Sequence, residues 1–349
     1  MMEILGVRFA PLNVPLKRRL ETLSAALLII VLGFGDLIGY VLTAYLLFYT
    51  ETVRYFILFY FIWMYYDWDT CNKGGRAARW TTWIRNCAWM QYICNYFPVK
   101  LVKTTDLDPE KNYLFCSFPH GILSTGIFGA FGSDILGCKQ LFPGLDVRVV
   151  VLDQHFQIPL FREYVSATGG VSSTAKSLNY LASTKPEKPY TGRATILIVG
   201  GASESLECQP GTYRILVKRR KGFVKIALKN GIPLVPVFSF GETDIYDQVY
   251  GTEGSTLKKV QHFIRKKIGI APIILRGRGF FQYSFGIIAQ RRPITVVVGS
   301  PIELPKIPEP TTEQIDEYHE IFIKRLVELF ESNKHKYVEN PESVTLELL

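Results

Sequence analysis

Hydrophobic residues are concentrated in one long segment near the start of the chain, Leu23–Tyr66. This segment is mostly apolar and contains only three charged residues, Asp36, Glu51 and Arg54. It is more than twice as long as the roughly 20 apolar residues that one membrane-spanning helix needs. The pattern therefore predicts a hairpin of two passes that turns near Thr50–Arg54.

The second leg of this hairpin, Tyr55–Tyr66, is short and rich in aromatic residues. A re-entrant or partly interfacial passage therefore stays open beside a complete span. Basic residues lie on both sides of the hairpin, at Lys17–Arg19 and again between Lys73 and Arg85. Because basic residues flanking a span favour the cytosolic side, both ends of the chain are expected in the cytosol. The chain then divides into a cytosolic segment 1–22, a membrane hairpin 23–66 and a cytosolic domain 67–349.

Asp36 is the charged residue within the first leg, where glycines surround it in the sequence. A carboxylate at membrane depth is costly and is often functional. The alternative is that Asp36 faces its partner helix or marks a kink, and we favour this structural interpretation.

Beyond the hairpin, apolar runs of strand length alternate with stretches of helical periodicity, which is typical of α/β proteins. The predicted strands are Tyr113–Ser117, Val147–Leu152, Thr195–Val199, Leu234–Phe238 and Thr295–Val298. The predicted helices are Gly121–Phe131, Ser172–Ser183, Lys221–Lys229, Thr256–Ile268 and Thr311–Lys336. We therefore expect an α/β domain with a mixed, largely parallel sheet, anchored by the N-terminal transmembrane hairpin.

Composition and charge narrow the class of partner. The chain has 349 residues, of which 48% are hydrophobic, and a formal net charge of +9 that favours anionic partners. It has no zinc-finger, RNA-recognition or basic-zipper pattern, so we expect membrane lipids and phosphorylated small molecules rather than nucleic acid. The six cysteines show no Cys-x-x-Cys spacing, which predicts reduced thiols and no metal site.

The strongest candidate for catalysis is His120, in the sequence Phe118-Pro119-His120-Gly121. This motif follows a predicted strand and opens a predicted helix, so His120 is expected at the carboxyl end of a strand, where open α/β sheets bind ligands. Imidazole is the usual general base for an alcohol, and Gly121 would leave the ring accessible. On position alone, a histidine with a structural hydrogen bond is the commoner alternative.

Three acidic residues are expected near this histidine. Asp153, Glu204 and Glu242 each come just after a predicted strand, on the edge of the sheet where His120 is placed. Any of them could orient the imidazole.

Two further features could bind phosphate or a developing negative charge. Gly200 and Gly201 follow a predicted strand and would let backbone amides approach an oxyanion or a phosphate, although a simple turn is an equal alternative. The basic run from Lys218 to Lys225 could bind the phosphates of a small molecule or anionic lipid headgroups, or it could be a solvated helix face.

The order and spacing of several motifs resemble the diacylglycerol acyltransferase type-2 family, which includes diacylglycerol, 2-acylglycerol and wax-alcohol acyltransferases. The resemblance covers nearly the whole chain. The motifs that carry it are Tyr96-Phe97-Pro98, Phe118-Pro119-His120-Gly121, Gly200–Leu206, Arg220–Val224, Val235–Glu242, Gly277-Arg278-Gly279 and Arg291–Thr295. The family usually has histidine-proline-histidine-glycine, whereas this chain has Phe118 at the first position. We therefore assign catalysis to His120 and expect Phe118→His to be tolerated.

The resemblance implies an O-acyltransferase of the endoplasmic reticulum membrane, with its catalytic domain facing the cytosol and with lipid-droplet association in some members. It implies acyl-CoA as co-substrate, no bound cofactor and a neutral acylglycerol as acceptor, with Arg278 among the candidate substrate-binding residues. Diacylglycerol is the first choice of acceptor. The alternatives are 2-monoacylglycerol, then a fatty alcohol, and outside enzymes a membrane-shaping hairpin protein. A homo-oligomer is left open.

Overall fold

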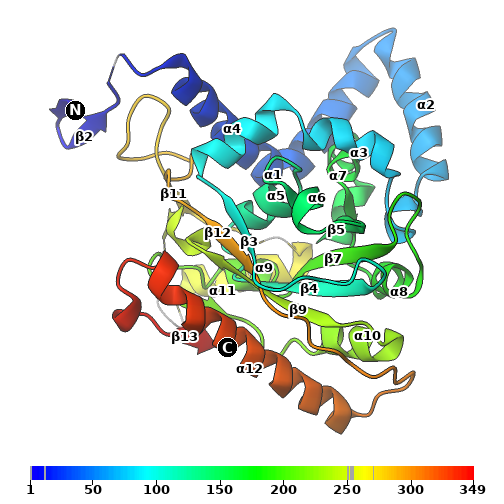
Figure 1. The fold of residues 1–349 in the computed structure, drawn as a ribbon. Coiled ribbons are helices and arrows are strands. Elements are labelled where there is room, and N and C mark those ends of the chain that lie inside the picture. Colours follow the sequence, from blue (N-terminus) through cyan, green and yellow to red (C-terminus); the bar gives the residue numbers. More distant parts are fainter. Residues whose placement is uncertain (1, 12, 250, 252–254, 270) are drawn as a thin grey trace.

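The computed structural model describes residues 2–11, 13–249, 251, 255–269 and 271–349. Its centre is a seven-stranded sheet in which every neighbouring pair is parallel except β12 and β9 (Figure 1). The strand order is β3 (Lys100–Lys103), β12 (Thr295–Val298), β9 (Leu234–Phe240), β4 (Asn112–Phe118), β7 (Gly192–Ile198), β5 (Leu145–Val151) and β6 (Gly170–Ser172). The expected mixed, largely parallel sheet is therefore confirmed.

Helices cover both faces of this sheet. One face packs against α1 (Leu16–Tyr49), α4 (Ala88–Tyr96) and α5 (Thr125–Phe131), and the other against α10 (Gly222–Asn230) and α12 (Thr312–Tyr337). In β4, Tyr113 and Phe115 enter the first core, whereas Leu114, Cys116 and Phe118 enter the second. This alternation follows from the two-residue period of a strand. Because both faces of the central strands are buried, their sequences are continuous apolar runs.

The remaining elements are short or lie at the edges of the domain. They are α2 (Val53–Tyr66), α3 (Ala78–Arg85), α6 (Cys138–Leu141), α7 (Phe161–Ala167), α8 (Ala175–Ser183), α9 (Ala202–Ser205), α11 (Thr256–Ile268), β1 (Met2–Ile4), β2 (Val7–Phe9), β8 (Tyr213–Ile215), β10 (Asp247–Gln248), β11 (Leu275–Arg276), β13 (Leu346–Leu348), and the 3-10 helices η1 (Thr70–Asn72), η2 (Asp153–Gln157), η3 (Glu242–Asp244) and η4 (Pro341–Ser343).

The predicted elements occur close to their expected bounds, with instructive differences at two helix starts. The helix expected from Gly121 begins at Thr125, because Gly121 and Ser124 adopt positive φ angles of 61° and 53° that an α-helix cannot contain. Ser172, expected in a helix, ends the short strand β6. The final helix begins as the sequence predicts, with a capping box between Thr311 and Gln314.

The N-terminal hairpin consists of two helices that pack against each other, α1 and α2. By length and hydropathy, α1 can cross a membrane. Both helices expose large apolar side chains, among them Phe34, Leu37 and Phe48 in α1 and Phe56, Phe59 and Trp63 in α2. Exposed apolar surface of this extent is typical of helices that contact lipid.

The opposite side of α1 packs against the domain. Glycines allow the close approach, since a Cβ atom at Gly39 would lie 2.7 Å from the carbonyl oxygen of Pro159 and from Ile158 Cγ2. Next to this contact, Asp36 Oδ1 lies 2.8 Å from Nδ1 of His155. Asp36 therefore faces the domain, a location that neither sequence interpretation included.

This packing predicts opposite effects for two glycine substitutions in α1. Gly39→Ala should lower the free energy of unfolding by about 1–3 kcal/mol, because its methyl group would overlap main-chain atoms that cannot move aside. Gly33→Ala is the control, since its Cβ would make only ordinary contact with Ile29 at 3.4 Å, and alanine favours a helix. Thermal unfolding of the purified protein in detergent measures both. Equal stability of the two variants would show that α1 does not dock as described.

Candidate active site

His120 lies just beyond the carboxyl end of β4, the central strand between β7 and β9. The segments that follow these two neighbours carry Glu204, in α9, and Glu242, in η3. Because β4, β7 and β9 are mutually parallel, their carboxyl ends meet at one edge of the sheet. The fold therefore brings His120, Glu204 and Glu242 together.

Both carboxylates bind main-chain amides rather than the imidazole. Glu204 accepts hydrogen bonds from the backbone N–H groups of His120 and, at 2.7 Å, Leu216. Glu242 accepts from the N–H groups of Thr125 and Gly126, at 2.7 and 2.6 Å. The expectation that an acidic residue orients the ring is corrected here: these two residues fix the loop that carries the histidine.

Burial sets the protonation of these carboxyl groups. Glu204 and Glu242 are both 1% exposed, and loss of hydration raises the pKa of each to about 7. The amide hydrogen bonds act in the opposite direction, because they stabilise the ionised form. The ionised form of each carboxyl group, which is populated as the pH rises through about 7, holds the loop by charge-assisted hydrogen bonds in a dry environment, where such bonds are strong.

The side chain that contacts the imidazole is the hydroxyl of Ser205, whose Oγ lies 2.9 Å from His120 Nδ1. The carbonyl oxygen of Gly121 lies 3.2 Å from the same nitrogen. In the tautomer that has its hydrogen on Nδ1, this nitrogen donates to the carbonyl oxygen, which only accepts, and Nε2 keeps a lone pair. Ser205 belongs to the motif Gly200–Leu206, and its position directly after Glu204 is the sequence signal that points to this contact.

The protonation state of His120 suits this arrangement. Burial lowers the pKa of the imidazole to about 4, although the main-chain contacts partly oppose the effect. The ring is therefore neutral at physiological pH and able to accept a proton. This pKa lies below the near-neutral value at which a general base is most effective at physiological pH.

The glycines of the site make room for the two carboxylates. A Cβ atom at Gly121 would lie 2.5 Å from Glu242 Cγ, and one at Gly200 would overlap the carboxylate of Glu204. Gly121 and Gly201 also adopt positive φ angles, of 61° and 59°. The lack of space for a Cβ atom and the positive φ angles explain why glycine occupies these positions. The binding of an oxyanion at Gly200 and Gly201 stays a prediction.

Two candidate residues lie elsewhere. Asp153 follows β5, which is separated from β4 by β7, and it accepts a hydrogen bond from Ser172 Oγ at 2.6 Å. Arg278 stacks over the ring of Tyr283 at 4.2 Å and lines a small cavity together with Arg18, near the start of α1. Neither residue contacts His120, and a substrate-binding role for Arg278 stays a prediction.

Phe118 points away from His120. It is fully buried in the second core, where its ring centroid lies 6.3 Å from that of Phe322 in α12. An imidazole there would be surrounded by apolar side chains. This environment speaks against the expectation that Phe118→His is tolerated, which stays a prediction to be tested.

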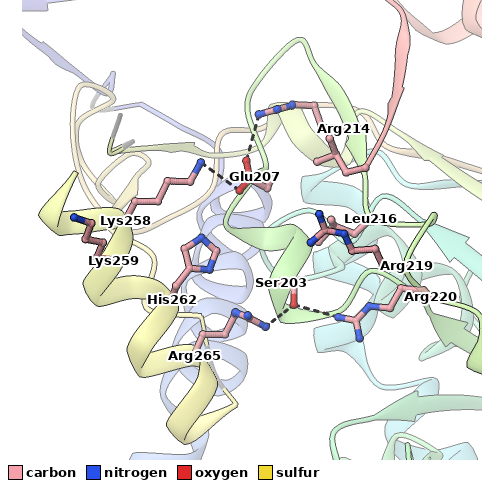
Figure 2. Close-up of a pocket in the computed structure, with 11 residues that line it drawn as sticks. Ser203, Glu207, Arg214, Leu216, Arg219, Arg220, Lys258, Lys259, His262 and Arg265 are labelled. Atoms are coloured by element: carbon pink, nitrogen blue, oxygen red, sulfur yellow. Dashed lines mark hydrogen bonds and ion pairs between the residues drawn. The ribbon is translucent and has the colours of Figure 1, made fainter. Parts of the chain in front are cut away.

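A cavity of about 1070 Å³ opens beside α9 (Figure 2). It is lined by Ser203, Glu207, Arg214, Leu216, Arg219, Arg220, Lys258, Lys259, His262, Arg265 and Leu349. The predicted basic run is thus divided: Arg219 and Arg220 reach the cavity, whereas Lys221 pairs with Asp316 at 2.6 Å. The contribution of α11 was missed, because nothing local in the sequence relates residues 258–265 to residues 203–220.

Within the part of the chain that the structure describes, no group of His, Cys, Asp and Glu side chains is arranged to hold a metal ion.

Comparisons with known proteins agree with the family resemblance. The family model described as "Diacylglycerol acyltransferase" matches residues 45–348. The chain is 44% identical to 2-acylglycerol O-acyltransferase 1 of Bos taurus, over 97% of this chain and 98% of that protein. It is 40% identical to diacylglycerol O-acyltransferase 2 of Dictyostelium discoideum, over 94% and 96%. It is 43% identical to the Danio rerio protein of the same name, over 82% and 78%.

Among solved structures, the chain is similar to a 1-acyl-sn-glycerophosphate acyltransferase of Thermotoga maritima, which matches 91% of this chain and 97% of its own. The sequence identity is 14% and the TM-score 0.39, a likeness too weak to support a conclusion.

The surroundings of Phe118 lead to a stability prediction. Phe118→His should lower the free energy of unfolding by about 1–3 kcal/mol, because it buries polar ring atoms without hydrogen-bond partners. Phe118→Met, which keeps an apolar side chain of similar volume, is the control and should cost less than about 1.5 kcal/mol. Both are measured by thermal unfolding. A histidine variant as stable as the methionine variant would mean that this core accommodates an imidazole.

Proposed function

The chain belongs to the diacylglycerol acyltransferase family, and we propose that it transfers an acyl group from acyl-CoA to the free hydroxyl of diacylglycerol, forming triacylglycerol. The observation that carries the proposal is the neutral ring of His120, whose Nδ1 is held by Ser205 and Gly121 while Nε2 is left for a substrate. The cavity beside α9 also supports it, since its lining residue Ser203 lies in the same short helix as Ser205, which contacts the ring.

In the proposed reaction, Nε2 of His120 accepts the proton of the acceptor hydroxyl as its oxygen attacks the thioester carbonyl carbon. A carbon–oxygen bond forms, the carbon–sulfur bond breaks, and CoA leaves as a thiolate that takes the proton from the imidazolium. Ser205 lies within reach of the ring but is 2% exposed, which favours a positioning role over that of a nucleophile. The acyl group thus passes directly between substrates, without an acyl-enzyme.

The membrane hairpin suits this chemistry, because an acyl chain and an acylglycerol both dissolve in a bilayer. We place the enzyme in the endoplasmic reticulum membrane with its catalytic domain in the cytosol, and extend this to the surface of lipid droplets. The basic residues at Lys17–Arg19 and between Lys73 and Arg85 support the cytosolic orientation. The packing of α1 along the domain supports a site close to the membrane surface.

A second acceptor, 2-monoacylglycerol, is favoured by one observation: the relative from Bos taurus that carries the name 2-acylglycerol O-acyltransferase 1 is 44% identical over nearly the full length of both chains. The product would then be diacylglycerol. A fatty alcohol is the third choice.

An acceptor panel tests the substrate proposal. Purified protein is incubated with labelled acyl-CoA and, separately, with diacylglycerol, 2-monoacylglycerol, a fatty alcohol and a lysophospholipid. We expect triacylglycerol to form fastest. Diacylglycerol formed without triacylglycerol would promote 2-monoacylglycerol to the main acceptor, and transfer only to the lysophospholipid would refute a neutral acylglycerol acceptor.

The catalytic role of His120 is tested by its replacement with alanine. His120→Ala should reduce kcat by about 10²–10⁴-fold, or roughly 3–5 kcal/mol of transition-state stabilisation, because the general base is lost. His335→Ala is the control, since His335 is an exposed residue of α12 outside the site and should leave the rate unchanged. If well-folded His120→Ala kept more than about a tenth of the rate, His120 would have a structural role.

A further inference from the structure

The cavity beside α9 has a strong positive charge. Its lining includes six cationic side chains, Arg214, Arg219, Arg220, Lys258, Lys259 and Arg265, and the carboxylate of Glu207. Figure 2 shows them on facing sides, with α11 on one side and the segment around Arg219 on the other. Cations that converge on one space repel one another unless an anion lies between them, so this arrangement favours an anionic ligand.

The acidic residues nearby neutralise only part of this charge. Arg214 pairs with Glu207 and Glu347, and Lys258 pairs with Glu207. Among the described residues, the other four cations have no carboxylate within ion-pair distance: Arg219, Arg220, Lys259 and Arg265.

Arg220 and Arg265 use only some of their N–H groups in hydrogen bonds. Arg220 and Arg265 both donate to the neutral oxygen Ser203 Oγ, at 3.1 and 2.6 Å. The Nε atom of Arg265 is buried and has no hydrogen-bond partner among the residues that the structure describes. A guanidinium group binds phosphate through two parallel N–H donors, so a phosphate at this point would use donors that the protein leaves free.

We infer that this cavity binds the phosphates of the CoA nucleotide, an inference that rests on acyl-CoA being the donor in the proposed function. CoA carries a diphosphate bridge and a ribose 3′-phosphate, which match several separate cations better than one phosphate would. The volume of about 1070 Å³ lies at the upper end of small-molecule sites, as a nucleotide requires.

The position of the cavity relative to His120 fits this assignment. Ser203, which receives the two arginines, and Ser205, which contacts the imidazole, both belong to the four-residue helix α9. Leu216 lines the cavity, and its N–H donates to Glu204, which also binds the N–H of His120. A nucleotide held here would lie beside the catalytic loop, with its pantetheine arm free to bring the thioester to Nε2.

The test compares two double variants of the full-length protein that remove the same charge. Arg219→Gln/Lys259→Gln removes two cavity cations that make no ion pair in the described chain, which leaves the internal contacts intact. Lys266→Gln/Lys267→Gln removes two exposed cations from the same helix outside the cavity and is the control. KM is measured for acyl-CoA and for an acyl-pantetheine thioester, which lacks the nucleotide.

We expect the cavity variant to raise KM for acyl-CoA by about tenfold or more, because charge-assisted bonds to phosphate are lost, while kcat changes by less than about twofold. Its KM for acyl-pantetheine and the kinetics of the control should not change. An unchanged KM for acyl-CoA, or an equal rise in the control, would overturn the assignment.

Direct binding separates this inference from the proposed function. Calorimetry with CoA and dephospho-CoA should show weaker binding of CoA to the cavity variant and a smaller loss for dephospho-CoA. If CoA binding falls as expected but the wild-type protein transfers no acyl group, the proposed function fails and the site stands. If binding to phosphatidylserine vesicles falls while CoA binding does not, the cavity binds lipid headgroups and the assignment fails.

Discussion

The geometry of the candidate site depends on two buried carboxylates that bind the main chain around His120. Glu204 holds the N–H of His120 itself, and Glu242 holds the N–H groups at the start of α5. Without them, these amides would be buried without partners, which costs about 1–3 kcal/mol for each group. The same two side chains explain why Gly121 and Gly200 are glycines. The loop is therefore fixed before any substrate binds.

In the proposed mechanism, the residues that hold the loop differ from the residue that accepts the proton. Because the carboxylates are occupied by amides, a hydroxyl group and a carbonyl orient the ring, and neither brings a negative charge that would raise its basicity. Burial then keeps the imidazole neutral, with its pKa lowered to about 4. The lowered pKa makes His120 a weaker base. The proposed reaction would therefore rely on positioning the acceptor hydroxyl and the thioester as well as on proton transfer.

The N-terminal helical hairpin is part of the same packed structure as the domain. Ala25, Leu28 and Ile29 of α1 join the core above the sheet, and Gly39 lies against the main chain at Pro159. The other side of α1 exposes apolar side chains. A helix that is apolar on several sides can pack against protein on one side and leave apolar side chains exposed on the other, as a helix that contacts lipid would require.

The sequence by itself determined the α/β class, the central strands, the last helix and the position of His120 at a strand end, because hydrophobic periodicity is a local signal. It also placed Glu204 and Glu242 at the correct edge of the sheet. Only the tertiary structure decided what these carboxylates bind, that Ser205 contacts the ring, that Phe118 faces α12 and that α11 completes a basic cavity. Those facts depend on side-chain directions and on contacts between distant segments, which no local pattern records.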